Sequence, residues 1–454
     1  AAWRISEENF FKNSSISSWF SNLKLRASYG MMGDDNLGGL YPDFAYLSGY
    51  TYYKGQSLMP DDPFSSVKSK KVIGSAPKGI PVTTISWMKI KLMNVGIDFG
   101  FFDNRLTGEF DLFKRMRDGI PGTPSDIMFP LETGLSALPE NMNSDMTVGF
   151  DAFVKWNDKV GDLKYSVGAN ITFARQKNGK RHGEIFGNAW DKYRWAQSNR
   201  WSNVVLNTDQ GNAGGVWMWE VIGRFETQEQ IDSYPVDQDG QNNATVRPGD
   251  VILRDVNGDG IINDFDERPQ AYASADWPWD SSTSNKNPLI SMGINLGFEW
   301  KGFDVAADFA GGFKNTFVAD WDLKWGVTRS VNGYYYNNID VWRHEDIFDP
   351  KSPWIPGKFP ALRGQESHSG RWWNSFYTRE VNYLRLRNLV VGYSLPKNWI
   401  RKVGMEQCRI YFQGTNLFCL SSLHDYGFDP EISTVNGQDY PQHKVLTLGV
   451  NVKF

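Results

Sequence analysis

The stretch that decides the fold is Lys444-Val-Leu-Thr-Leu-Gly-Val-Asn-Val-Lys-Phe454. From Leu446 to Phe454 every second residue is apolar, and the residues between them are polar or glycine. A period of two is the pattern of a β-strand with one apolar and one polar face. A soluble β-sandwich can contain such a strand, but the wall of a transmembrane β-barrel consists of them. The fold therefore depends on whether the pattern recurs.

The same alternation recurs along the whole chain and predicts an all-β protein with about ten strands. The clearest pair covers residues 290–300 and 303–309, joined by Lys301-Gly302. The complete set of predicted strands covers residues 23–30, 93–101, 106–112, 148–156, 163–173, 290–300, 303–309, 380–393, 408–417 and 444–454.

The connections between these strands alternate between short and long. The short ones cover residues 102–105, 157–162, 301–302 and 394–406, and the long ones cover residues 32–86, 118–145, 177–288, 316–379 and 418–443. Outer-membrane barrels have this asymmetry, with short periplasmic turns and long extracellular loops. Because an open sheet edge is not tolerated in lipid, we expect residues 1–454 to form the C-terminal part of a larger antiparallel transmembrane β-barrel.

Aromatic residues mark the strand ends beside the short turns. This set comprises Trp19, Phe101, Phe102, Trp156, Trp300, Trp399 and Phe454. An interfacial girdle of a membrane barrel requires aromatic residues at these places. If the apolar face meets lipid, the opposite face contains Lys24, Arg26, Glu109, Asp111, Lys164, Asn170, Asn295, Glu299, Asp304, Asp308, Arg385 and Arg387.

Composition excludes several classes of protein. The net charge of −4 gives no basic footprint for nucleic acid. Mean hydropathy is −0.48, and no apolar run is long enough for a transmembrane helix. Two cysteines, Cys408 and Cys419, do not form a disulfide framework. No catalytic motif is present: Ser421, Ser422 and His424 are the only local candidates for a hydrolase, and no orienting acid accompanies them.

The connection 177–288 contains a candidate calcium loop at residues 255–266. Its donors follow the spacing of an EF-hand loop, with a backbone carbonyl at the seventh position and glycine at the sixth. The predicted ligands are Asp255, Asn257, Asp259, Ile261, Asn263 and Asp266. The last position is Asp where an EF-hand has Glu, and the alternative is a hairpin turn that binds nothing. If Ca²⁺ binds, we expect a weak structural site.

Most of the 19 tryptophans lie in the long connections. Exposed aromatic rings can stack on sugars or grip the apolar side chains of a peptide. The candidate substrate-binding residues are Trp217, Trp219, Trp321, Trp325, Trp372 and Trp373. The alternative is that these side chains serve as hydrophobic anchors on which the loops fold.

Several motifs resemble those of the SusC/RagA-type TonB-dependent outer-membrane transporters, in collinear order along the chain. They are Trp3-Arg-Ile-Ser-Glu-Glu8, Leu23-Lys-Leu-Arg-Ala-Ser-Tyr-Gly30, Asn94-Val-Gly-Ile-Asp-Phe-Gly-Phe-Phe-Asp-Asn-Arg-Leu106, Pro248-Gly-Asp-Val-Ile-Leu-Arg-Asp-Val-Asn-Gly-Asp-Gly260, Tyr383-Leu-Arg-Leu-Arg-Asn-Leu-Val-Val-Gly-Tyr393, Gly414-Thr-Asn-Leu-Phe418 and Asp429-Pro-Glu431.

The resemblance implies a barrel of roughly 22 strands, in the outer membrane of a Gram-negative bacterium. It also implies an N-terminal plug and a segment that contacts TonB, neither of which we expect within these residues. A SusD-like surface lipoprotein would cover the pore, and two transporter–lid pairs would form a dimer. The implied function is import of an oligosaccharide without covalent chemistry. The alternatives are an oligopeptide importer of the same type and a surface adhesin or scaffold that transports nothing.

Overall fold

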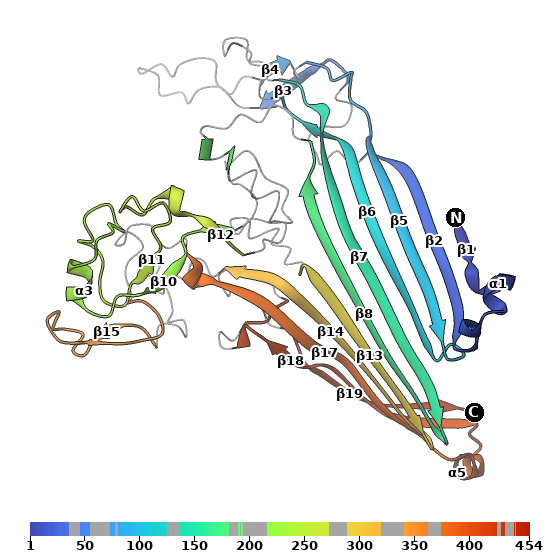
Figure 1. Cartoon of the computed structure of the whole chain (residues 1–454). Coiled ribbons are helices and arrows are strands. Elements are labelled where there is room, and N and C mark those ends of the chain that lie inside the picture. The colour runs from blue at the N-terminus through green and yellow to red at the C-terminus, as the bar shows by residue number, and fades with distance from the viewer. Residues whose placement is uncertain are drawn as a thin grey trace.

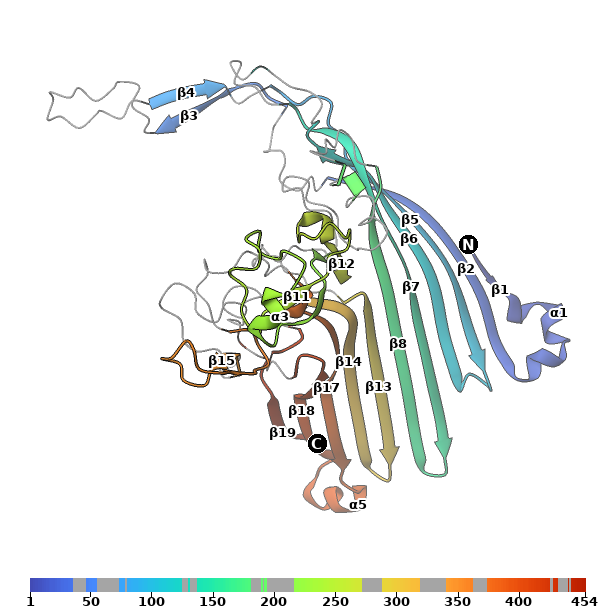
Figure 2. The ribbon, with the colours of Figure 1, turned by 60° about the vertical axis from the view of Figure 1, so that its left-hand side comes forward.

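One antiparallel sheet of eleven strands dominates the computed structural model of the chain (Figure 1). The strands lie in the sheet in sequence order: β1, β2, β5, β6, β7, β8, β13, β14, β17, β18 and β19. The sheet curves into an open wall, with tight turns at one end of the strands and the long connections at the other (Figure 2). The structure describes residues 1–35, 46–54, 73–77, 80–124, 130, 137–180, 189–190, 192–193, 216–271, 288–318, 340–361, 374–424, 428–431, 440 and 442–454.

All ten predicted strands are present, and the predicted all-β antiparallel fold is confirmed. The strands of the wall are β1 Ala2–Arg4, β2 Phe20–Asp34, β5 Met88–Phe101, β6 Leu106–Gly122, β7 Glu140–Val160, β8 Leu163–Asn178, β13 Ile290–Trp300, β14 Phe303–Val318, β17 Thr378–Ser394, β18 Gln407–Ser421 and β19 Val445–Lys453. The sequence did not predict β1, which adds three residues to the edge beside β2.

Several strands are longer than predicted. The predicted turn at residues 157–162 is wrong, because β7 continues to Val160 and pairs there with Leu163 of β8. The turn is therefore only two residues long, and Gly161 adopts the left-handed conformation with φ 60°. Likewise, β6 extends to Gly122 and β7 begins at Glu140, inside the predicted connection 118–145. Strand ends outside an apolar layer can be polar on both faces, so the alternation does not reveal them.

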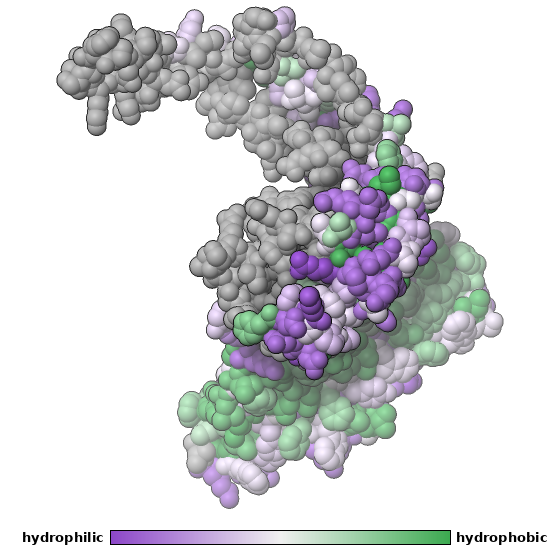
Figure 3. Space-filling view, turned by 90° about the vertical axis from the view of Figure 1, so that its left-hand side faces the viewer, coloured by the Kyte–Doolittle hydropathy of each residue, from purple (hydrophilic) through white to green (hydrophobic). Residues whose placement is uncertain are grey.

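The two faces of the wall differ as the alternation predicts. The outward side chains of Val95, Leu112 and Leu448 are 60%, 53% and 78% exposed. Figure 3 shows hydrophobic residues gathered over the strands, whereas hydrophilic residues predominate on the described loop region above them. An exposed apolar surface of this extent marks an interaction surface. No helix in the described ranges is long and apolar enough to cross a membrane.

Aromatic side chains gather at the end of the wall that carries the tight turns. The ring centroids of Phe20 and Phe101 lie 4.4 Å apart, and those of Trp19 and Phe101 lie 5.6 Å apart. In the β5–β6 turn, the ring centroid of Phe102 lies 6.2 Å from that of Trp156 on β7. Trp300 lies beside the β13–β14 turn and is 46% exposed. The aromatic residues predicted at the strand ends thus form a row along this rim.

A compact loop unit, residues 216–271, lies beside the ends of β14 and β17 that are opposite the tight turns (Figure 1). Its strands pair as β9 Val216–Met218 with β12 Arg268–Ala271, and as β10 Val221–Arg224 with β11 Val251–Leu253. Helix α3, Gln228–Asp232, begins where the Thr227 side chain accepts a hydrogen bond from the Gln230 amide, a favourable N-cap. Two buried clusters stabilise the unit: Trp219, Val251, Leu253 and Ile262 in one, and Phe225, Ile231, Val246 and Ile252 in the other.

Two further hairpins lie in the long connections. Strands β3, Tyr50–Lys54, and β4, Ile73–Pro77, pair in the first connection. Strands β15, Arg343–His344, and β16, Trp354–Ile355, form a short hairpin after the loop unit. The remaining described elements are short helical turns: η1 Ile5–Glu7, α1 Asn9–Lys12, η2 Ser15–Ser18, η5 Asp264–Asp266, η7 Ser375–Tyr377, α5 Lys397–Ile400 and η8 Arg401–Val403.

Candidate functional site

The polar face of the wall carries ion pairs that join neighbouring strands. Arg26 of β2 contacts Asp98 of β5 at 2.6 Å and Asp111 of β6 at 2.8 Å, and Lys24 contacts Asp98 at 3.1 Å. Alternation places all of these side chains on the face opposite the apolar one. Gly96 lies between them, and a Cβ atom at Gly96 would be 2.2 Å from the Asp111 carboxylate. The small residue therefore leaves room for the charged network.

The same face continues across the second half of the wall. Arg409 of β18 donates two hydrogen bonds to the carboxylate of Asp304 of β14, one of them at 2.9 Å. The amide of Asn295 donates to the Asp308 carboxylate at 2.7 Å. Lys164 and Glu299 form an exposed ion pair at 3.1 Å. A face rich in paired charges suits contact with water or with a polar segment of protein.

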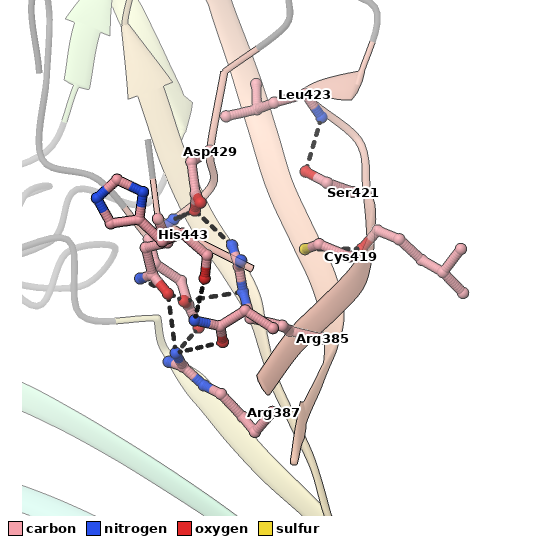
Figure 4. A network of polar contacts seen from close by, with 11 residues as sticks. Arg385, Arg387, Cys419, Ser421, Leu423, Asp429 and His443 are labelled. Atoms are coloured by element: carbon pink, nitrogen blue, oxygen red, sulfur yellow. Dashed lines mark hydrogen bonds and ion pairs between the residues drawn. The ribbon is translucent and has the colours of Figure 1, made fainter. Parts of the chain in front are cut away.

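A cluster of charged side chains lies on β17 near the long connections, where Arg385 and Arg387 meet two carboxylates (Figure 4). Arg385 contacts the Asp429 carboxylate and lies 3.0 Å from that of Glu431. Arg387 lies 2.6 Å from Glu431 and donates a second hydrogen bond to Gln442 at 3.1 Å. The side chains of Arg385, Asp429 and Glu431 are only 5%, 9% and 8% exposed.

This carboxylate–arginine cluster unites two motifs that lie more than forty residues apart. One is the stretch around Arg385 and Arg387 on β17, and the other is Asp429-Pro-Glu431 in the β18–β19 connection. Gln442 closes the cluster, because its amide donates to Glu431 at 2.9 Å. Buried charges are stable only when they are paired and hydrogen-bonded. The cluster therefore attaches the described parts of the β18–β19 connection to β17.

Three candidate calcium ligands lie in a loop that closes on itself through hydrogen bonds. The Asp255 carboxylate accepts from the amides of Gly258 and Gly260 at 2.6 and 2.8 Å. The Asp259 carboxylate accepts from the Ile261 amide at 3.0 Å, and this bond, followed by the Asn257 side-chain hydrogen bond, lowers the pKa of Asp259. Asn257 donates to Asp259 at 2.9 Å.

The other end of this loop is more tightly buried. Asp266 is fully buried, and its carboxylate accepts from the amides of Val256 and Asn263, both at 2.9 Å. Asp266 thus joins the two ends of the loop. Within the described ranges, no group of three or more His, Cys, Asp or Glu side chains is placed to hold a metal ion. Oxygen donors from Asn side chains and backbone carbonyls would have to complete a calcium site here.

Of the six tryptophans predicted to bind substrate, Trp219 is the one whose side chain the structure describes. Trp219 is 7% exposed in the core of the loop unit, and its indole N–H donates to the Asn263 carbonyl at 2.8 Å. Trp219 is therefore an anchor of the loop unit, and its prediction as a ligand contact does not fit this burial. Trp217 lies in β9, but its side chain is outside the described part of the structure. The remaining candidates, Trp321, Trp325, Trp372 and Trp373, lie outside the described residues.

The hydroxyls of Ser421 and Ser422, the candidates for a hydrolase, make local structural bonds. The Ser422 hydroxyl donates to the Glu380 carbonyl at 2.8 Å and accepts from the Asn382 amide at 3.0 Å. The Ser421 hydroxyl accepts from the Leu423 amide at 3.0 Å. The Ser422 bonds attach β17 to the end of β18, and among the described residues neither serine hydroxyl has a histidine partner.

Asp239 fixes a turn of the loop unit. Its carboxylate accepts from the Gln241 and Asn243 amides at 2.7 and 2.9 Å, and from the amide and hydroxyl of Thr245, both at 2.7 Å. Burial raises the pKa of Asp239, but the hydrogen bonds from Thr245, Gln241 and Asn243 outweigh it and lower the pKa to about 2. The ionised carboxylate therefore stabilises the turn.

We expect this turn to loosen in acid. A folded-state pKa below the unfolded one means that stabilisation is complete above about pH 4 and is lost as the pH falls through about 2. The loss amounts to about 2 kcal/mol. The protection of amides in residues 237–246, measured as hydrogen–deuterium exchange relative to the intrinsic exchange rate at each pH, should fall over this window, and Asp239→Asn should show low protection already at pH 7. Glu229→Gln, on the exposed helix α3, is the control, and equal exchange in both variants would refute the assignment.

Comparison with known proteins identifies relatives of the whole chain. The chain is 23% identical over 464 residues to the TonB-dependent receptor SusC of Bacteroides thetaiotaomicron, and the match covers 100% of the chain and 39% of that receptor. It is 23% identical over 505 residues to a TonB-dependent receptor of Formosa agariphila, of which it covers 42%. The chain thus spans about two fifths of the length of these relatives. No family model matches the sequence.

Solved structures share the fold. The structure of the RagAB peptide transporter matches 100% of this chain with a TM-score of 0.62 and 20% identity, and the match covers 43% of that chain. The RagAB peptide importer in the closed-closed state gives a TM-score of 0.64 and 19% identity, again with 43% of that chain covered. The resemblance of this chain to the SusC/RagA-type TonB-dependent receptors, inferred from its sequence motifs, is confirmed.

Proposed function

We propose that this chain forms part of the barrel wall of an outer-membrane importer that takes up an oligomeric nutrient in a TonB-dependent manner. The observation that carries the proposal is the division of the wall into two faces. The outward face exposes apolar side chains such as Val95 and Leu448, and the opposite face carries the ion pairs of Arg26 and Arg409. A wall of this kind can meet lipid on one side and a polar lumen on the other.

The relatives support the partners in this proposal. They are named as TonB-dependent receptors, and RagAB is named as a peptide importer with open-open and closed-closed states. We propose that the complete protein couples to TonB and works with a SusD-like lipoprotein lid, and that two transporter–lid pairs form a dimer. No covalent step is required of this chain.

The proposed cargo is an oligosaccharide, and an oligopeptide is the second candidate because the matched structures are of a peptide importer. The test is uptake by the parent bacterium with and without the gene. Fluorescent oligosaccharides of several linkages and oligopeptides of similar mass should be supplied separately. Loss of oligosaccharide uptake alone would support the first candidate, and loss of peptide uptake alone would support the second.

A surface adhesin or scaffold is the alternative from another class. Such a protein would bind its ligand at the cell surface but would not internalise it. Cells lacking TonB separate the two functions, because an importer keeps surface binding and loses internalisation. If internalisation is unchanged without TonB, or never occurs with any supplied oligomer, the importer proposal fails.

We also propose that residues 255–266 bind Ca²⁺ as a structural clip of the loop unit. The support is the order of oxygen donors, Asp255, Asn257, Asp259, the Ile261 carbonyl, Asn263 and Asp266, together with the turn that they already form. Each carboxylate oxygen has two lone pairs, so an oxygen that accepts an amide hydrogen can still face a cation. In this site Ca²⁺ would supply charge neutralisation and rigidity.

Isothermal titration calorimetry of the complete purified protein with Ca²⁺ tests whether residues 255–266 bind the ion. We expect a dissociation constant of roughly 10⁻⁴–10⁻³ M, as for other extracellular sites, and at least a tenfold weakening in Asp259→Asn. Asp259 is suitable because it is exposed and its hydrogen bonds to described residues lie within the loop. Glu229→Gln removes the same charge from the same unit and should leave the affinity unchanged. No calcium-dependent heat in the wild type would refute the site.

A further inference from the structure

The connection between β17 and β18 carries three cationic side chains on two consecutive helical turns. Lys397 begins α5, and Arg401 and Lys402 begin η8. All three side chains are exposed. In the described part of the chain, none of them has a carboxylate oxygen within ion-pair distance. They form a local concentration of positive charge, here called the basic turn.

Three other cations at the same end of the wall are paired with nearby carboxylates. Arg105 faces Asp158 at 3.5 Å, and Lys301 faces Asp162 at 3.8 Å. Lys453 faces Glu406 at 3.2 Å, which removes the acidic residue closest in sequence to the basic turn. The basic turn therefore differs from these three places, where a carboxylate offsets the positive charge.

The basic turn is held in a defined conformation. Ile400 is 3% exposed, and it anchors the turn while its neighbour Trp399 is 65% exposed. The Met405 amide donates to the Ile400 carbonyl at 3.2 Å, and the Leu395 amide donates to the Cys408 carbonyl at 2.9 Å. Gly404 ends η8 in the left-handed conformation with φ 77°. An ordered backbone keeps the cationic residues close to Trp399.

Helix α5, which contains Trp399, lies beside β18, and the outer faces of β18 and β19 expose apolar side chains. Ile410 of β18 is 42% exposed, and its partner Val450 of β19 is 57% exposed. Trp399 also belongs to the aromatic row at the turn end of the strands. Aromatic rows of this kind lie at the level of the lipid headgroups, with the hydrocarbon region on one side. The basic turn thus lies at the height where a phospholipid has its phosphate, and the acyl chains would meet Ile410 and Val450.

We propose that the basic turn binds the headgroup of an anionic phospholipid of the surrounding bilayer. Lys397, Arg401 and Lys402 would contact the phosphate oxygens, since clusters of basic residues beside a bilayer recognise anionic lipids. Trp399 would pack at the boundary between headgroup and acyl chains. The inference rests on the proposed placement in the outer membrane, because the lipid must reach the turn from the same side as the exposed wall.

The test uses the complete protein in nanodiscs that contain equal amounts of phosphatidylcholine and phosphatidylglycerol. The phosphatidylglycerol that remains bound after transfer to detergent is counted by native mass spectrometry. In the triple variant Lys397→Gln, Arg401→Gln and Lys402→Gln, we expect the affinity for phosphatidylglycerol to fall by roughly 100-fold, since each basic residue near an anionic surface contributes about fivefold. Phosphatidylcholine retention should not change.

The matched control removes three exposed cations from the loop region instead: Arg247→Gln, Arg343→Gln and Lys351→Gln. It should retain wild-type amounts of phosphatidylglycerol. A second measurement follows the quenching of tryptophan fluorescence by brominated phosphatidylglycerol and brominated phosphatidylcholine. The wild type should be quenched more by the anionic lipid, and Trp399→Phe should remove most of this difference.

The outcomes separate this inference from the proposed function. If the wild type inserts into nanodiscs and the basic-turn variant retains as much phosphatidylglycerol as the control variant, the lipid site is refuted while the membrane placement stands. If the protein does not insert into nanodiscs, both fail. The inference does not require any particular cargo, so a negative uptake experiment leaves it intact.

Discussion

Replacing Arg385 by alanine should release the described part of the β18–β19 connection from β17 and cost about 3–5 kcal/mol of local stability. The reason is the burial of its partners, since the side chains of Asp429 and Glu431 are only 9% and 8% exposed. Without the guanidinium group, two carboxylates remain close together with Arg387 as their only described cation. Hydrogen–deuterium exchange of peptides that contain residues 428–431 should accelerate by at least 100-fold.

Lys164→Ala is the control for this prediction. It removes an ion pair of the same face, but the Lys164 and Glu299 side chains are 62% and 63% exposed. Exposed pairs contribute about 1 kcal/mol or less, so exchange around this site should change little. A double variant, Arg385→Ala with Glu431→Gln, should recover part of the protection because it removes one unpaired charge. Unchanged exchange in Arg385→Ala would show that the cluster does not hold the connection.

Replacing Gly249 by alanine should disrupt the contact between the loop unit and the β15–β16 region. Gly249 has φ 92°, and an added Cβ atom would lie 2.3 Å from Cγ of Trp342, which is 6% exposed. The left-handed conformation costs an L-residue about 1–2 kcal/mol, and overpacking adds about 1–3 kcal/mol. Tryptic cleavage after Arg254, which is followed by Asp255, should therefore become at least tenfold faster.

Gly240→Ala separates the two causes. Gly240 also has a positive φ, 72°, but nothing lies within 4 Å of the added Cβ position. Its cost should be limited to backbone strain, and cleavage should accelerate much less than in Gly249→Ala. Equal cleavage rates in the two variants would mean that the Trp342 side chain can move without loss of stability and that packing at Gly249 is unimportant.

The wall could be predicted from the sequence wherever one face meets an apolar layer. The hairpin of β13 and β14 shows this, because Ile294 and Leu296 lie opposite Phe309 and Ala307 in the observed register. The prediction failed at strand ends such as residues 157–160, where polar residues continue the ladder and no alternation is required. It was less regular in β17, where a bulge between Leu386 and Asn388 shifts the pattern by one residue.

The candidate sites depended more on tertiary structure. The ligand spacing at residues 255–266 is local, and the loop indeed forms a compact turn. By contrast, the burial of Trp219 depends on its packing against Val251 and Leu253, which no local pattern contains. The pairing of Arg385 with Asp429 could not be predicted from the sequence either, although the two residues belong to the motifs 383–393 and 429–431. Proximity of two motifs is decided by the register of the wall and by the path of the connection between them.

The order of strands in the wall has a consequence for its assembly. Each strand pairs with the wall strand that precedes it in the sequence, so successive hairpins can add one at a time to the edge of the growing sheet. The longest separation is between β8 and β13, where Phe173 pairs with Ile290 although more than a hundred residues lie between them. The entropic contribution to the free energy of closing that loop is roughly 3 kcal/mol larger than that of closing a hairpin turn. We therefore expect the wall to form as two blocks, β1–β8 and β13–β19, whose junction is the slow step of folding.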